Sequence, residues 1–184
     1  SGGNSLGGTT TATIANGVGT FSGLYVYGLI SNSNTITYSS GALTTDGQSF
    51  SITHSAAYQL SITTAAAGAT NGSNFTTQPV VAILDQDGNS VTTGAQSTQN
   101  ITVTTSAATL AGTTAVGGAS GTGVATFTDL KLTGTANPSI TLTYTITSPS
   151  TITKTQTIAL VAGAPTQLVV VTGAQNCGSR NACS

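Results

Sequence analysis

Apolar and polar residues alternate along short segments of this chain, and Gly, Asn and Asp separate one segment from the next. Successive side chains of a β-strand point to opposite faces, so a period of two predicts strands with one buried face. No segment shows a helical period, and the segments are rich in Thr, Val and Ile, which favour strands. From residue 55 onwards they are YQLSIT (58–63), PVVAILD (79–85), NITVTT (100–105), GVATFTDLKL (123–132), SITLTYTIT (139–147) and TQTIALV (155–161). We therefore expect an all-β chain of antiparallel β-sandwich type.

The chain also repeats itself, which fixes how the strands are grouped. The matching segments are NGVGTFSGL (16–24) with TGVATFTDL (122–130), TITY (35–38) with TLTY (141–144), and AAYQLSITT (56–64) with APTQLVVVT (164–172). The first two pairs lie 106 residues apart and the third pair lies 108 residues apart. We therefore predict three parts in tandem: the C-terminal half of one unit (1–54), a complete unit (55–162), and the first strand of a further unit with a Cys-containing tail (163–184).

Within the complete unit, the order of four segments carries a family resemblance. VVAILDQDGNSV (80–91), NITVTT, GVATFTDLKLTG (123–134) and SITLTYTIT resemble the bacterial Ig-like repeats of the intimin and invasin kind, which occur in tandem in surface proteins and adhesins. In those repeats a strand ends in a D-x-x-G-N corner and a G-V-A-T strand follows later. The resemblance implies Ig-like β-sandwich units in tandem and an extracellular, cell-surface location. The low charge departs from the family, whose repeats usually carry more Lys, Glu and Asp.

The composition disfavours several classes of function. The chain has 3 Lys and Arg, 4 Asp, no Glu and a single His, with a net charge of −1. So few titratable groups hardly suffice for an enzyme, and His54 has no G-x-S-x-G motif beside it, so we expect a non-catalytic protein. Binding to nucleic acid needs Lys and Arg to neutralise phosphates, and no apolar run approaches the ~20 residues that span a bilayer. We expect neither a nucleic-acid partner nor membrane insertion.

The polar corner after the run Val80 to Leu84 is the one candidate metal site. Asp85, Asp87 and Asn89 alternate along DQDGN, and such oxygen ligands suit Ca²⁺. The alternative is a β-turn in which Gly88 takes a positive φ and the polar side chains bond local backbone. Calcium is the one cofactor that the sequence suggests.

Two covalent modifications are also predicted. Cys177 and Cys183 lie close together near the C-terminus, and a disulfide between them is expected in an oxidising compartment, with free thiols as the alternative. N-glycosylation sequons begin at Asn71, Asn74 and Asn100.

These observations lead to a structural role in an extracellular fibre. We expect the chain to act either as an adhesin stalk or as a polymerising filament subunit, with copies of itself as partners through strand addition or end-to-end packing. TQLVVVTGA (166–174) resembles the opening strand of a unit and is the natural donor, but it replaces one strand only. A longer array explains the same division. The alternative function is an adhesin module that binds a glycan, or a protein of a host or neighbouring cell.

Overall fold

The computed structural model describes residues 4–169, and within this range the chain forms β-strands, turns and bends and no helix. The all-β expectation is confirmed. The strands are β1 (Ser5–Gly7), β2 (Ile14–Ala15), β3 (Val18–Gly19), β4 (Tyr25–Tyr27), β5 (Ser31–Tyr38), β6 (Asp46–Ile52), β7 (Gln59–Thr64), β8 (Ala69–Thr70), β9 (Val80–Leu84), β10 (Asn100–Thr105), β11 (Thr109–Ala111), β12 (Ala115–Gly117), β13 (Val124–Thr126), β14 (Lys131–Thr133), β15 (Asn137–Ile146) and β16 (Ile152–Val161).

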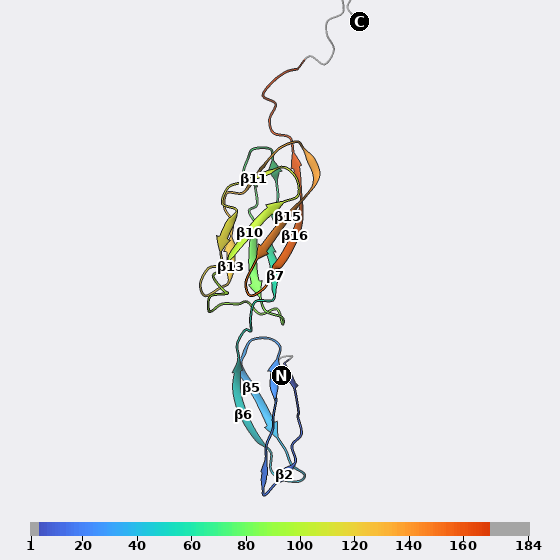
Figure 1. Cartoon of the computed structure of the whole chain (residues 1–184), viewed down its shortest axis with the longest axis vertical. Coiled ribbons are helices and arrows are strands. Elements are labelled where there is room, and N and C mark those ends of the chain that lie inside the picture. Colours follow the sequence, from blue (N-terminus) through green and yellow to red (C-terminus); the bar gives the residue numbers. More distant parts are fainter. Residues whose placement is uncertain (1–3, 170–184) are drawn as a thin grey trace, which may run out of the picture.

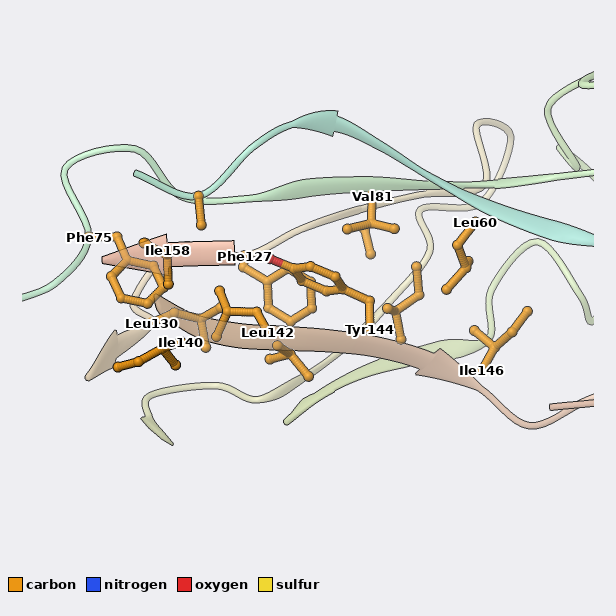
Figure 2. Close-up of a cluster of buried hydrophobic side chains, with 14 of the residues drawn as sticks. Leu60, Phe75, Val81, Phe127, Leu130, Ile140, Leu142, Tyr144, Ile146 and Ile158 are labelled. Carbon is orange, nitrogen blue, oxygen red and sulfur yellow. The ribbon is translucent and has the colours of Figure 1, made fainter. Parts of the chain in front are cut away.

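After residue 55 the strands form two main sheets that share one core. A three-stranded antiparallel sheet has the order β13-β9-β7, and a five-stranded sheet has the order β12-β10-β15-β16-β8. We expected antiparallel sheets only, but the larger sheet is mixed, because β8 runs parallel to β16. Alternate residues of β15 are buried from Ile140 to Ile146, as a period of two requires. Figure 2 shows their side chains meeting those of Leu60 and Val81, which come from β7 and β9.

The segment GVATFTDLKL, expected as one strand, is divided into β13 and β14. The first pairs with β9 and the second pairs with β11, so the chain changes sheet between them. In the gap, the Phe127 N–H donates to the Pro79 carbonyl at 3.1 Å, and the Leu130 N–H donates to Gln78 Oε1 at 3.0 Å. These two contacts satisfy the peptide groups that leave the ladder, while Phe127 and Leu130 stay in the core.

Residues 4–54 form three two-stranded antiparallel pairs, β1 with β4, β2 with β3, and β5 with β6. They reproduce later strands in order, but the register differs in one pair: Tyr38 of β5 pairs with Asp46, whereas Tyr144 of β15 pairs with Lys154, which lies 108 residues after Asp46. β3, β4, β5 and β6 begin 106 residues before β13, β14, β15 and β16, and β1 begins 104 residues before β11. Leu6 pairs with Val26 in the same way as Leu110 pairs with Leu132.

The two stretches lie end to end along the long axis of the molecule (Figure 1). Among residues 4–169 there is no helix that is long and apolar enough to cross a membrane.

Candidate functional site

The first candidate site is the apolar face of β4, β5 and β6. Phe21 and Tyr38 lie with their ring centroids 5.6 Å apart and their planes at 50°. The matching rings of Phe127 and Tyr144 are 6.0 Å apart at 55°. Phe127 and Tyr144 are completely buried, whereas Phe21 is 37% exposed. The N-terminal stretch therefore contains the aromatic pair of a core that nothing within residues 4–169 covers.

An open groove beside β4 extends this face. Its apolar lining is Leu24, Tyr25, Val26, Ile36, Phe50 and Ile52. The residues 106 positions after Leu24, Val26 and Ile36 are Leu130, Leu132 and Leu142, and all three belong to the buried core. By strand pairing, Phe50 and Ile52 of β6 match Ile158 and Leu160 of β16, which are core residues as well. No side chain described between residues 4 and 54 is itself buried. We call this surface the open face.

The reason for the exposure is visible in the strand pairing. In the later stretch the core is closed by β7 and β9, and β15 pairs with β10 as well as with β16. Among residues 4–54 no strand corresponds to β7, β9 or β10, so β5 pairs with β6 alone. The open face therefore carries both uncovered apolar side chains and an unpaired strand edge.

The second candidate site is the corner at residues 85–89. The Asp85 carboxylate accepts hydrogen bonds from the N–H groups of Asp87 (3.0 Å), Asn89 (2.8 Å) and Ser55 (2.9 Å), and from the Asn89 side-chain amide (3.0 Å). Gly88 has a φ of 87°, as a tight turn of this kind requires. Burial by itself raises the pKa of Asp85, but these hydrogen bonds outweigh it and hold the pKa below its ordinary value of 3.8.

This geometry suits a hydrogen-bonded turn better than a calcium ion. The donors around Asp85 point their hydrogens at the carboxylate oxygens that a cation would need. The Asp87 side chain is exposed, while Asp85 and Asn89 are buried. Within the described part of the chain, no three His, Cys, Asp or Glu side chains gather in a way that could hold a metal. Calcium at Asp85, Asp87 and Asn89 stays a prediction.

Asn89 also reaches across to the preceding stretch. Its Oδ1 accepts a hydrogen bond from the Ile30 N–H at 2.8 Å, and its Nδ2 donates to the Gly28 carbonyl at 3.0 Å. The same side chain is bonded to Asp85, which in turn holds the Ser55 N–H of the connecting segment. The corner is therefore the junction between the two stretches.

His54 lies in this junction. The Thr93 N–H donates to Nε2 at 3.2 Å and the Thr93 hydroxyl lies 2.8 Å from the same atom. Nδ1, the other ring nitrogen, lies 2.9 Å from the Ser55 carbonyl oxygen. The contacts of His54 are those of a side chain that ties residues 54 and 55 to Thr93.

The remaining predicted sites are placed as follows. Asn71, Asn74 and Asn100 are exposed, and Asn71 Oδ1 accepts a hydrogen bond from the Gly134 N–H at 2.9 Å. Cys177 and Cys183 lie outside the described residues.

Sequence reasoning missed Gly28 and Ile30 as partners of Asn89. The available signal was a glycine at the same repeat position, in YGLIS (27–31) and TGTAN (133–137).

Comparisons of this chain with protein-family models, with curated proteins and with solved structures find no match.

Proposed function

We propose that this chain is a non-catalytic structural module of an extracellular surface fibre, built from Ig-like β-sandwich units of the intimin and invasin kind. The observation that carries the proposal is the open face. Its apolar residues are at most half-buried, whereas most of their repeat counterparts, among them Phe127, Leu142 and Tyr144, are completely buried in the core.

The open face calls for the first half of a unit, namely strands equivalent to β7, β9 and β10. Burial of exposed apolar surface stabilises a complex by about 25 cal/mol per Å². An unpaired strand edge favours the addition of another strand. β5 carries no charged residue that would discourage such pairing. The missing strands come from another copy in a filament, or from neighbouring sequence of the same array in a stalk.

The fibre is tested by immunogold electron microscopy of native extracellular material, with antibodies raised against this chain. Label along surface fibres at a regular axial interval is expected. Label confined to the cell interior contradicts the proposal.

The source of the missing strands is tested by sedimentation velocity of the purified chain at increasing concentration. In a filament subunit, Phe21→Asp weakens association because it places a charge on the open face. Ser49→Asp is the matched control. Ser49 bonds Thr35 on the outward side of the β5–β6 pair, so the substitution adds the same charge away from the open face. If the purified chain stays monomeric but native fibres are labelled, the missing strands come from neighbouring sequence of the same array.

A further inference from the structure

The Asn89 side chain binds the preceding stretch as a peptide group would. It accepts from one backbone N–H and donates to one backbone carbonyl, and these belong to residues two apart, Ile30 and Gly28. An asparagine side chain carries both an acceptor and a donor. Ionised Asp lacks the donor, Leu lacks both groups, and Ser is too short to reach the Gly28 carbonyl and the Ile30 N–H together. Asp85 accepts hydrogen bonds from the same amide and so fixes its orientation.

The complete unit repeats this docking loop at its other end. Gly134 and Ala136 lie 106 residues after Gly28 and Ile30. Both glycines have positive φ, 133° at Gly28 and 155° at Gly134, which an L residue rarely adopts. Asn89 contacts backbone groups alone in this loop, so the change from Ile30 to Ala136 leaves the chemistry unaltered.

The two loops also have the same place in their strand pairs. β5 begins at Ser31, which pairs with Ile52 near the end of β6. β15 begins at Asn137, which pairs with Leu160 near the end of β16. Each loop therefore lies beside the strand by which the chain leaves that stretch, where a following unit begins.

At the second loop, the matching carbonyl and N–H have no partner among residues 4–169. Asn71 takes the Gly134 N–H, and within residues 4–169 neither the Gly134 carbonyl nor the Ala136 N–H has a hydrogen-bond partner. Gly134 and Ala136 are both exposed. The loop thus presents an open acceptor and an open donor in the arrangement that Asn89 fills at the first loop.

We propose that the Gly134–Ala136 loop is a docking site for the corner asparagine of a following unit of this design, placed in series with this one. The proposal rests on the proposed function, because it requires tandem units. The occupant is a following unit, since residues 164–172 resemble the opening of the complete unit. Asn89 of a second copy is already bonded within its own chain. Repeated at each junction, this contact sets the angle between consecutive units.

The test uses an extended chain in which residues 1–163 are followed by a second copy of residues 56–163. Amide hydrogen exchange measured by NMR follows the Ala136 N–H. We expect it to exchange at least about tenfold more slowly in the extended chain than in the original one, and we expect the hydrogen-bonded Ile30 N–H to be protected in both chains. Asn89→Ala in the appended copy removes this protection and leaves Ile30 protected, and the same change in the first copy does the reverse.

Asn100→Ala in the appended copy is the matched control, because Asn100 is exposed on β10 and its loss leaves Ala136 protected. Equal exchange of Ala136 in both chains, with the appended core folded, overturns the docking site but not the fibre, which immunogold labelling tests separately. An appended unit that cannot fold in this position also counts against the docking site.

Discussion

The matched aromatic pairs provide a test of the open face within one chain. Phe127 is completely buried and packs against Tyr144. Truncation to alanine leaves a cavity in a closed core, and such Phe→Ala changes cost about 3–5 kcal/mol of unfolding free energy. Since a domain is stable by about 5–15 kcal/mol in total, Phe127→Ala removes a large share of the stability of the stretch after residue 55.

Phe21→Ala makes the same chemical change at the matching position of the open face. Phe21 is 37% exposed, and its ring contact is with Tyr38. A ring that remains partly in water and leaves no closed cavity costs about 1 kcal/mol when truncated. If the open face is covered in a fibre as proposed, the cost of Phe21→Ala there rises toward that of Phe127→Ala.

The assay is urea unfolding followed by NMR, with a separate reporter in each stretch. Leu142 in β15 and Ile36 in β5 occupy matching positions, so their amide signals follow the two stretches independently. We expect Phe127→Ala to lower strongly the urea midpoint reported by the Leu142 amide signal. We expect Phe21→Ala to leave this midpoint unchanged. Equal losses of stability for both variants in the dilute chain would refute the reasoning, because they would mean that Phe21 is covered as Phe127 is.

Three further predictions concern single residues. The pKa of Asp85 is lowered, so the stability that it contributes is present above about pH 5 and is lost as the pH falls through the folded pKa. Asp85→Asn therefore lowers the melting temperature at neutral pH and flattens the decline of the melting temperature in acid. An unchanged acid profile contradicts this. Burial raises the pKa of Tyr144 to about 12 from 10.0, so the unfolded chain loses this proton first and stability falls by about 3 kcal/mol between about pH 10 and 12; Tyr144→Phe abolishes that part of the alkaline loss in thermal scans. Gly112 has a φ of 101° and a Cβ there would overlap the Asp129 carbonyl, whereas Gly121 has a φ of 87° and open space around it. Gly112→Ala therefore lowers the free energy of unfolding, measured with urea, by about 2 kcal/mol or more beyond the loss caused by Gly121→Ala. Equal losses would refute the close approach at Gly112.

Strand positions were predictable because they depend on local alternation. NITVTT forms β10 at the expected residues, and β9 and β7 differ from their predicted segments by one or two residues. The sequence analysis missed the break between β13 and β14, although Phe127 and Leu130 are three residues apart and would face opposite sides of one continuous strand. What divides the segment is the side chain of Gln78, 52 residues away, which replaces a strand partner for the Leu130 N–H.

The role of the corner was predictable in part. The sequence indicated either a turn or oxygen ligands, and Gly88 with its positive φ fits the turn. The partners of Asn89 lie 59 and 61 residues away, and backbone groups leave no trace in composition or spacing. The repeat could have pointed to them, because a glycine that recurs at positions 28 and 134 marks a backbone conformation shared by both loops.

The scarcity of charge and the junction have a mechanical consequence for a fibre. The two carboxylates with lowered pKa, Asp85 and Asp129, both accept backbone N–H groups at bends in the chain. The junction consists of a few such hydrogen bonds, each worth about 1 kcal/mol, whereas β15 and β16 pair at eight positions above a continuous core. Under tension along the long axis, Asn89 therefore separates from Gly28 and Ile30 before β15 separates from β16. A fibre of such units would lengthen first by bending and extension at its junctions, while each core stays folded.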